Sequence, residues 1–523
     1  MADLGDSGAN RNPQGNPPGN PPQDPRDRVD LLVIGGGING AGIARDAAGR
    51  GLSVVLCEKD DVAQGTSSRS SRLVHGGLRY LEHGEFRLVR ESLAEREVLL
   101  AIAPHLVRPM QFVLPHVEQM RAHWMLHAGL FVYDHLASRT QLDASRAIAL
   151  DQDPMGAAVR PEIRRGFTYF DCRTDDARMV VGNLKAARSL GAQVLTRTEL
   201  QYAEPEGDGW NVRLRNARDG SIRVVRTRTL VNAAGPWVGA AATRILGVAA
   251  PTPVRLIKGS HVVVEKFWEG SHAYLLQNVD RRAVFATPYE GTLAMIGTTD
   301  VPYEGAPEQV AISPDETRYL CDAANRQLRC ALTPDSVVHS YAGVRCLVDD
   351  AHANPSEITR DYRLELARAA NGASVLSVLG GKITTYRRLA EHVLQLLRPI
   401  HPQMRESWTA TLPLPGGDLP GGDFDRALSE YVRASALMPP QHASGLFHRH
   451  GSLARRILDP VSGPAAAGRH FGAGFYECEA RYAIEEEWAQ TPEDVLWRRT
   501  KFGVLLSRDQ REEFTRWMLA QPT

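Results

Sequence analysis

A glycine-rich turn near the start of the chain could hold the phosphates of a dinucleotide. The turn, Gly35-Gly-Gly37-Ile-Asn-Gly40, matches the pattern GxGxxG. We expect Gly35 to allow the tight turn, Gly37 to let the backbone approach a pyrophosphate, and Gly40 to let a helix pack closely on a strand. Glu58 follows 23 residues after Gly35 (58 − 35 = 23), where a carboxylate can accept hydrogen bonds from ribose hydroxyls. An acid at this place favours NAD or FAD over NADP.

The residues around this turn predict the elements that must position it. Residues 31–34 predict a strand, a helix follows the turn, and residues 53–56 predict a second strand that leads to Glu58. The N-terminus of the helix would present free N–H groups and the positive end of its dipole to the phosphates. The glycine pattern alone is weak evidence, but strand, turn, helix, strand and acid in this order strongly indicate a dinucleotide site.

A second segment, residues 65–82, favours FAD over NAD. It is rich in hydroxyl side chains and glycines, Gly65-Thr-Ser-Ser-Arg-Ser-Ser-Arg-Leu-Val-His75-Gly-Gly-Leu-Arg-Tyr80-Leu-Glu. Small residues let a backbone lie against a flat ring, and hydroxyls can bond phosphate and ribitol oxygens. The alternative is a polar surface loop.

The composition excludes several other classes of protein. The 523 residues suffice for two or three domains, and 61 basic side chains balance 61 acidic ones, so we expect no nucleic-acid partner. The six cysteines are scattered without a CxxC pair, which argues against a metal site or a disulfide framework and fits a reducing cytosol. No stretch has the roughly 18 uninterrupted apolar residues of a membrane span.

The remaining pattern predicts the order of the domains. Residues 1–28 are half Pro, Gly and Asn and lack the apolar core of a signal peptide, so we expect a disordered tail. Residues 29–410 mix helical and strand patterns, with a helix followed by a strand over 176–195, a hairpin around Asp219-Gly220, and strands at 262–264, 284–286 and 293–296. Residues 411–424 are dense in Pro, Gly and Asp and predict a linker, and residues 425–523 predict a small helical domain. One face of the helix in the 176–195 segment would carry Val180, Val181, Leu184 and Leu190.

The sequence resembles the FAD-dependent, quinone-linked glycerol-3-phosphate dehydrogenases, within the D-amino-acid-oxidase-like flavoproteins. The motifs occur in the family's order: VIGGGINGAGIARDAAGRG (33–51), SSRSSRLVHGGLRYLEHGEFRLVRESLAEREVLL (67–100), FTYFDCRTDDARMV (167–180), VNAAGPW (231–237), KGSH (258–261), YAGVRCLVDD (341–350), VLGGKITTYRRLAE (378–391) and VLWRRTKFG (495–503). One departure is Cys346, where the family has proline, which puts the rigidity of that turn in doubt. The resemblance implies an α/β fold: a Rossmann-like FAD-binding domain, an inserted antiparallel-sheet substrate domain, and a C-terminal α-helical domain.

The resemblance also implies how the flavin is held without a covalent bond. The adenosine half and pyrophosphate would lie on Gly35, Gly37, Gly40 and Glu58, with Ala233 and Gly235 closing over them. The rest of the cofactor would be lined by Ser67, Ser68, Leu73, His75 and Gly77, and the isoalloxazine would lie beside Gly380, Gly381, Lys382 and Thr384. A cation near the flavin pyrimidine edge stabilises the anionic reduced flavin.

The matched motifs supply a cationic pocket for a phosphate ester: Arg79, Tyr80, Arg345, Lys382 and Thr385. A phosphate of roughly −1.5 to −2 charge needs several such donors. Each cation also has a structural alternative, namely an Arg79–Glu82 pair, a helix cap by Lys382, and an Arg345–Asp349 pair.

The implied reaction moves a hydride from C2 of sn-glycerol 3-phosphate to flavin N5 and yields dihydroxyacetone phosphate. His261 is the candidate base because histidine has the right intrinsic pKa. Arg345 would stabilise the developing alkoxide, and Lys382 would act beside the flavin.

The resemblance implies membrane quinone as the electron acceptor. Residues 124–133, with Arg108, Arg121, His123 and Arg139 around them, suit a helix lying on the inner face of the cell membrane, as a peripheral attachment of a cytoplasmic enzyme. An ordinary buried helix is the alternative, and the resemblance allows a homodimer.

Three other functions stay open. A glycerol-3-phosphate oxidase would pass electrons to oxygen and make hydrogen peroxide. An amine or amino-acid oxidase of this fold would not need so many cations beside its flavin. A non-catalytic flavin-binding scaffold would keep its yellow absorbance when the ester is added.

Overall fold

The computed structural model describes residues 27–117, 121–280, 282–348, 361–435, 438–459 and 464–521. The expected tail therefore lies outside the described residues, except for Asp27 and Arg28. Arg28 already begins the first strand, β1 (Arg28–Ile34). Within the described part of the chain, no helix is both long and apolar enough to span a membrane.

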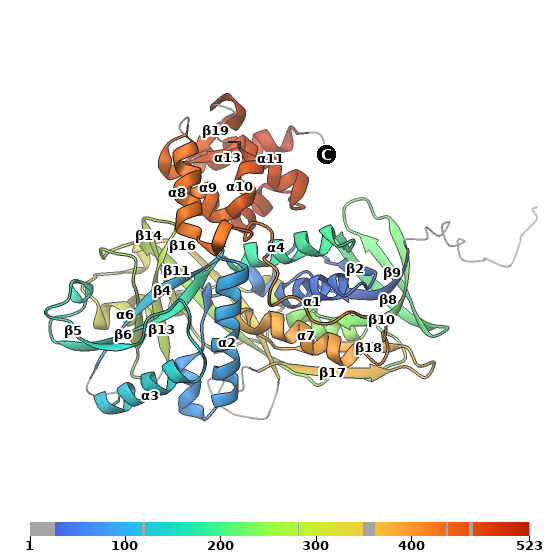
Figure 1. Cartoon of the computed structure of the whole chain (residues 1–523), viewed down its shortest axis with the longest axis horizontal. Helices are drawn as coiled ribbons and strands as arrows, with labels where there is room; N and C mark the ends of the chain where they lie inside the picture. The colour runs from blue at the N-terminus through green and yellow to red at the C-terminus, as the bar shows by residue number, and fades with distance from the viewer. Residues whose placement is uncertain are drawn as a thin grey trace, which may run out of the picture.

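The first layer is a mostly parallel sheet that carries the dinucleotide turn. Its main path is β17 (Arg363–Arg368), β18 (Ser374–Leu379), β10 (Ile222–Asn232), β1, β2 (Val54–Cys57) and β7 (Gln193–Leu195), with β8 (Thr198–Glu206) and β9 (Gly209–Asn216) attached through β10. The strands from β18 to β7 are parallel. Helices α1 (Ile38–Gly49), α4 (Asp176–Ser189) and α7 (Tyr386–Leu397) pack together against it (Figure 1). Parallel strands end at one edge, so their following loops meet there.

The second layer is a ten-stranded sheet, antiparallel except where β12 pairs with β4. Its strands are β15 (Val301–Pro302), β11 (Val254–Glu265), β14 (Leu293–Gly297), β13 (Ala283–Tyr289), β12 (Ala273–Gln277), β4 (Val107–Pro115), β6 (Arg165–Thr174) and β3 (Leu73–Val74), with β16 (Val337–Val348) beside β11 and β5 (Arg146–Ala149) beside β6. Helix α6 (Pro314–Gln327) packs on this sheet, and α2 (Phe86–Ile102) and α3 (His123–His135) lie near its other strands (Figure 1).

The C-terminal residues form a separate helical layer above the two sheets (Figure 1). Its helices are α8 (Phe424–Ala434), α9 (Pro440–His450), α10 (Ala454–Ile457), α11 (Glu477–Glu486), α12 (Phe502–Leu505) and α13 (Arg508–Leu519), with a π-helical turn at Asp494–Arg499 and a small hairpin of β19 (His470–Gly472) and β20 (Phe475–Tyr476). In the segment 411–424, Leu414 is fully buried and its N–H donates to the carbonyl of Ile102 at 2.8 Å. This segment therefore packs against the body of the protein.

The predicted fold class is confirmed, and most of the expected elements are present. The hairpin around Asp219-Gly220 joins β9 to β10, with Val212 opposite Val225. The helix and strand expected over 176–195 are α4, which ends at Ser189, and β7. Leu190 is 44% exposed because it follows the last helical turn. Placing Leu190 on one helical face with Val180, Val181 and Leu184 was therefore wrong. Cys346 was expected in a turn, but it lies inside β16, so no turn is present there.

Candidate active site

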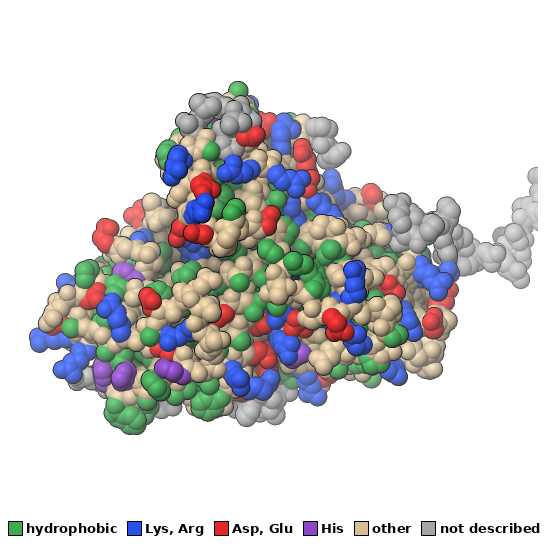
Figure 2. Space-filling view, in the orientation of Figure 1, with side chains coloured by type: hydrophobic (Ala, Val, Ile, Leu, Met, Phe, Trp, Pro, Cys, Tyr) green, Lys and Arg blue, Asp and Glu red, His purple; other side chains and the backbone are tan. Residues whose placement is uncertain are grey.

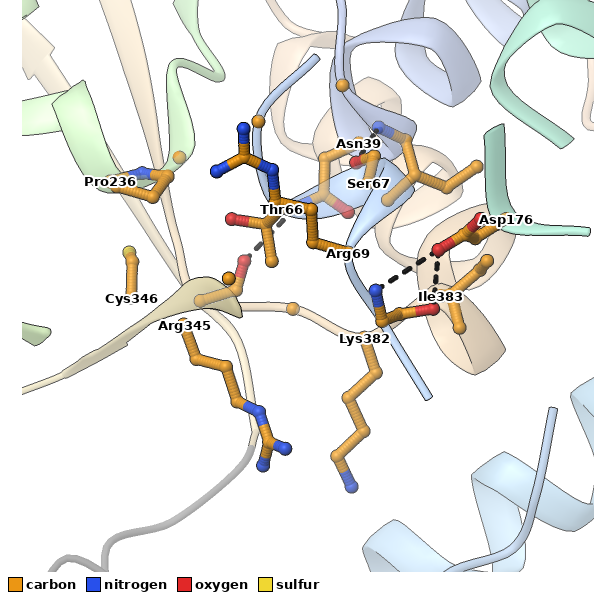
Figure 3. Close-up of a pocket in the computed structure, with 18 of the residues that line it drawn as sticks. Asn39, Thr66, Ser67, Arg69, Asp176, Pro236, Arg345, Cys346, Lys382 and Ile383 are labelled. Atoms are coloured by element: carbon orange, nitrogen blue, oxygen red, sulfur yellow. Dashed lines mark hydrogen bonds between the residues drawn. The ribbon is translucent and has the colours of Figure 1, made fainter. Parts of the chain in front are cut away.

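A cavity of about 670 Å³ opens where the carboxyl edge of the parallel sheet faces the antiparallel sheet. The loops after β1, β2, β10 and β18 contribute one wall, and β11 and β16 contribute the other. Sites at the carboxyl ends of parallel strands are where this kind of fold binds its ligands. Figure 3 shows residues from these segments turned toward one space.

Most of the sequence-predicted site residues line this one cavity: Gly35, Gly37, Glu58, Ser67, Leu73, His75, Gly77, Arg79, Tyr80, Ala233, Gly235, His261, Arg345, Gly380, Gly381, Lys382 and Thr384. Gly40, Ser68 and Thr385 are not among the lining residues. A Cβ on Gly40 would lie 2.0 Å from the carbonyl oxygen of Gly35, so this glycine allows α1 to pack on the turn. Thr385 is 1% exposed at the start of α7, away from the cavity surface.

The N-terminus of α1 opens into the cavity and can receive a pyrophosphate. Gly37 is its N-cap and makes no side-chain cap. The Ile38 N–H donates to the Ser67 hydroxyl at 3.0 Å, which ties the hydroxyl-rich loop to the helix. The Glu58 carboxylate accepts from the N–H groups of Gly36 at 2.7 Å and Asp60 at 2.8 Å, while burial raises its pKa. These contacts fix the Glu58 carboxylate beside the expected phosphate position, where it can accept hydrogen bonds from the ribose hydroxyls.

Two glycines let backbone surround the cofactor position. Gly35 has φ of +110°, and a Cβ there would lie 2.5 Å from the carbonyl oxygen of Ala233. Gly381 has φ of +100°, and a Cβ there would lie 2.8 Å from Asn39. The Asn39 amide donates to the Gly380 carbonyl at 3.0 Å, and its buried Oδ1 has no partner among the described residues. The glycine cradle and this buried acceptor beside the helix N-terminus fit a bound FAD.

Three cationic side chains, Arg79, Arg345 and Lys382, line the cavity. The Lys382 ammonium lies 3.8 Å from the centroid of the Tyr80 ring, and Arg345 contacts Asp300 at 3.3 Å. Figure 3 shows the Arg345 and Lys382 side chains extending in the same direction. Arg79 lines the cavity and forms no ion pair with any described residue. Fixed cations of this kind suit the oxygens of a phosphate group.

The structural alternatives considered for these three cations have different outcomes in the structure. Glu82, the expected partner of Arg79, pairs with Arg121 at 2.5 Å. Lys382 does precede a helical turn (Ile383–Thr385), but its side chain lies over Tyr80. Asp349 lies outside the described residues.

The candidate base His261 is buried and held on two sides. Its Nε2 lies 2.9 Å from the Ser71 hydroxyl, and its ring stacks on Tyr341 with centroids 4.8 Å apart. Burial, with a smaller effect of Arg345 and Arg72, lowers its pKa to about 3. His261 is therefore neutral at pH 7, which is the form that can accept a proton.

His75 lies in the flavin loop and is also neutral. Burial and the nearby Lys382 and Arg345 lower its pKa to about 3. Its backbone N–H donates to the Thr384 hydroxyl at 3.2 Å. This bond joins the flavin loop to the segment that carries Lys382.

Several lining residues were missed by the sequence analysis: Asn39, Thr66, Arg69, Ser71, Asp176 and Phe285. Asn39 occupies a free position of the glycine pattern, so the pattern itself gave no signal. Asp176 accepts from the N–H and hydroxyl of Ser70, at 3.1 and 2.8 Å, across a separation of 106 residues. Contacts over such distances leave no local pattern.

Comparison with known proteins agrees with this geometry. Residues 30–387 match the model of a family described as FAD dependent oxidoreductase, and residues 407–517 match the C-terminal domain of alpha-glycerophosphate oxidase. The chain is 50% identical to D-erythritol 1-phosphate dehydrogenase of Brucella abortus (94% of this chain, 98% of that protein) and 49% identical to glycerol-3-phosphate dehydrogenase of Pseudomonas aeruginosa (94% and 95%). The structure of glycerol-3-phosphate dehydrogenase from Bacillus halodurans complexed with FAD aligns with a TM-score of 0.73 at 28% identity, over 94% of this chain and 90% of that one.

One family model covers most of the chain, and relatives share about half of their residues with it over nearly its whole length. The cavity that the fold builds also carries the groups that an FAD needs. We conclude that this chain belongs to the family of FAD-dependent oxidoreductases and uses FAD as its cofactor.

Proposed function

We propose that this chain is a dehydrogenase that oxidises the C2 hydroxyl of sn-glycerol 3-phosphate to the ketone of dihydroxyacetone phosphate. The observation that carries the proposal is the convergence of Arg79, Arg345 and Lys382 on the cavity that also holds His261 and the FAD cradle. A dianionic ester needs such a cluster, whereas a zwitterionic amino acid does not. Relatives named glycerol-3-phosphate dehydrogenase, 45% and 49% identical to this chain, support the assignment.

The cations bind and orient the ester in this mechanism. Arg79 and Lys382 would grip the phosphate, and Tyr80 under the Lys382 ammonium fixes the position of that charge. The Arg345 guanidinium would lie near the C2 oxygen and stabilise negative charge as it develops there. Holding the phosphate at one end leaves C2 in a fixed place, which removes orientational freedom before the reaction.

His261 would remove the hydroxyl proton at Nε2. Ser71 already lies within hydrogen-bond distance of that atom, so the substrate hydroxyl would take a similar place or act through the serine. A phosphate dianion would offset part of the positive charge of Arg345 and so raise the pKa of His261, while burial remains the larger cause that keeps this pKa low. FAD, when bound, supplies the two-electron acceptor for the hydride that leaves C2.

Anaerobic titration tests this function directly. Glycerol 3-phosphate should bleach the flavin absorbance of the purified holoenzyme in a stoichiometric manner, and dihydroxyacetone phosphate should form in equal amount. Glycerol without the phosphate should bleach it far more slowly, because the cations then have no anion to bind. A flavin that stays yellow with the ester would overturn the proposal and favour a non-catalytic flavoprotein.

D-Erythritol 1-phosphate is a second candidate substrate. The relative of that name is 50% identical, as similar to this chain as the glycerol-3-phosphate dehydrogenases are. Both esters combine a terminal phosphate with a secondary alcohol, so the same cations and base would serve either one. The ratio of the two flavin-reduction rates, measured under the same anaerobic conditions, decides between them.

We propose membrane quinone as the acceptor and helix α3 as the membrane contact. Trp124 is 70% exposed and Phe131 60% exposed, and Met125 and Val132 are exposed beside them. Figure 2 shows hydrophobic side chains along the lower edge of the molecule, where Figure 1 places α3. Such a helix suits the interface of a bilayer, and the six free cysteines fit its reducing, inner side.

The basic fringe expected around α3 is smaller than the sequence indicated. Arg108 bonds His448 and Asp425 of the C-terminal domain, so it does not flank α3. Arg121 and Arg139 do lie next to the helix, each with a carboxylate partner. Apolar burial rather than net positive charge would therefore supply most of the membrane affinity. The residues invoked for catalysis all lie in one chain, so the chemistry does not require a homodimer.

A further inference from the structure

The motif Trp497-Arg-Arg-Thr-Lys501 lies in the C-terminal domain, and the proposed chemistry does not use it. Arg499 is fully buried and makes two hydrogen bonds to the Asp61 carboxylate, at 2.7 and 2.8 Å. Asp61 follows Glu58 by three residues in the loop after β2. The motif therefore fastens the C-terminal domain to the wall of the FAD cavity.

Trp497 begins a column of neighbouring rings, stacked at both ends and tilted in the middle, that reaches the candidate base. Its indole stacks on His339, with centroids 4.6 Å apart and planes 20° apart. Tyr341 lies two residues further along β16, on the same face, with its centroid 6.3 Å from that of His339. Tyr341 then stacks on His261, at 4.8 Å and 17°. In the sheet, Tyr341 on β16 is the register partner of His261 on β11.

The His261 ring also packs against the backbone of Gly297 on β14, where an added Cβ would lie 2.1 Å from the imidazole. Its Nε2 contacts the Ser71 hydroxyl at 2.9 Å, and its Nδ1 has no hydrogen-bond partner among the described residues. The ring is therefore held by the stack on Tyr341, by the backbone of Gly297 and by that one polar contact. Tyr341 in turn donates its hydroxyl proton to the Ser70 carbonyl at 2.9 Å. A shift of Tyr341 would move both neighbours of the imidazole.

A second contact of the motif supports the Ser70–Ser71 segment next to His261. The Lys501 ammonium donates to Asp175 at 3.1 Å, and Lys501 is 2% exposed. Asp175 caps α4, and the next residue, Asp176, accepts from the N–H and hydroxyl of Ser70. Both ends of the motif thus act on the Ser70–Ser71 segment that contacts His261.

We propose that Trp497 is a positioning residue for His261, so that the C-terminal domain holds the base of the reaction in register with the flavin. Trp497 touches neither substrate nor FAD and acts through His339 and Tyr341. The inference rests on the proposed role of His261. It gives the helical domain a role in catalysis in addition to its role in folding.

Three variants test the proposal with a matched control. Trp497→Leu removes the first ring of the column, and Trp497→Phe keeps an aromatic ring there. Trp517→Leu makes the same change in the core of the same domain, where Trp517 packs on Phe471 and Phe514 and not on the column. Each purified holoenzyme is compared in FAD content, thermal midpoint, KM and the rate of anaerobic flavin reduction by glycerol 3-phosphate.

We expect Trp497→Leu to slow flavin reduction about 10- to 100-fold while FAD content and KM stay near the parent values, because misplaced groups reduce the rate of the chemical step. Trp497→Phe should recover most of the rate, and Trp517→Leu should lower the thermal midpoint and keep the rate. Equal reduction rates for Trp497→Leu and Trp517→Leu would overturn the proposal.

Crystal structures of the two leucine variants give a readout that needs no substrate. The distance from His261 Nε2 to the Ser71 hydroxyl should lengthen in Trp497→Leu and stay unchanged in Trp517→Leu. An unmoved His261 in both variants would refute the positioning role. A parent enzyme that glycerol 3-phosphate does not reduce would instead refute the proposed function, since the crystallographic comparison does not depend on that ester.

Discussion

The ammonium of Lys382 lies over the face of the Tyr80 ring, 3.8 Å from its centroid. Lys382 comes from the glycine turn after β18, and Tyr80 comes from the turn Leu78–His83 near α2, so the contact joins two segments about 300 residues apart. A cation–π contact of this kind holds the charged end of a flexible lysine side chain in one place.

Removing the ring should therefore weaken binding of the ester more than it slows the chemical step. We expect Tyr80→Leu to raise KM for glycerol 3-phosphate about 5- to 30-fold, which corresponds to about 1–2 kcal/mol for a desolvated cation–π contact. Tyr80→Phe keeps the ring and serves as the control for loss of the hydroxyl. Steady-state kinetics separate KM from kcat, and a Tyr80→Leu enzyme with the parent KM would contradict the role given to the ring.

The Arg345 guanidinium should be essential to turnover and dispensable for cofactor binding. We expect Arg345→Ala to abolish measurable turnover, a loss of at least about 100-fold, because a developing alkoxide loses its charged donor. The flavin absorbance of the purified protein should equal that of the parent. Arg226→Ala is the control, since Arg226 is a half-buried arginine on β10 that pairs with Glu206 outside the cavity. Near-normal activity of the Arg345 variant would remove this residue from the mechanism.

Gly37 and Gly35 should respond to substitution in different ways. Gly37 has ordinary extended backbone, and a Cβ there meets only the Ser67 hydroxyl, at 3.2 Å. We expect Gly37→Val to fold and to lose most of its FAD, because the branched side chain fills the space above the N-terminus of α1. Gly35→Val should fail to fold, since its Cβ would overlap the Ala233 carbonyl. Circular dichroism reports folding and the 450 nm band reports flavin, and a fully flavinylated Gly37→Val protein would contradict the assigned pyrophosphate position.

The sequence predicted those parts of the site whose chemistry is local in the chain. The glycine turn, Glu58 and the glycines before Lys382 line one cavity because each follows a parallel strand, and a strand-and-turn pattern is readable over a few residues. The convergence of Arg79, Arg345 and His261 was predicted through the family resemblance and not through spacing. No periodicity in the sequence relates β11 and β16 to the loop after β2.

Other features depend on tertiary contacts that no local pattern encodes. The family resemblance predicts a turn at Cys346, but this residue lies within a long strand, opposite Leu256. Arg108 was predicted to flank α3 because the two are near in sequence, but Arg108 lies on β4 and contacts the C-terminal domain. The ring column from Trp497 to His261 unites residues from two strands and a π-helical turn, so only the folded chain shows it.

The exposed apolar face of α3 should govern attachment to lipid. We expect the double variant Trp124→Asp and Phe131→Asp to lose binding to liposomes in flotation assays, because both side chains leave water when the helix lies in the interface. Anaerobic flavin reduction by the ester should be unchanged, since neither residue lines the cavity. Asp substitutions at the exposed Leu190 and Leu246 provide a control for added charge elsewhere. Retained flotation of the α3 variant would exclude this helix as the contact.

A buried carboxylate in α11 should make the stability of the C-terminal domain depend on pH. Glu479 accepts from Arg449 at 2.6 and 2.8 Å and from His450 at 2.8 Å, and Arg449 beside it lowers the pKa of Glu479 to about 2 despite full burial. The folded pKa lies below the unfolded value near 4.5, so the stabilisation is present above pH 4.5 and is lost as the pH falls toward 2. Glu479→Gln mimics the protonated acid and should lower the free energy of unfolding by about 3 kcal/mol at pH 7.

The difference between parent and Glu479→Gln should therefore shrink in urea unfolding experiments once the pH drops below about 4.5, the unfolded pKa of a glutamate. Glu486→Gln, in the same helix, is the control, because Glu486 is 43% exposed and pairs at the surface with Arg188. An exposed pair of this kind contributes about 1 kcal/mol or less, so its variant should show a small difference at every pH. A Glu479→Gln penalty that stays constant from pH 7 to pH 3.5 would show that the interactions of Glu479 do not depend on its charge.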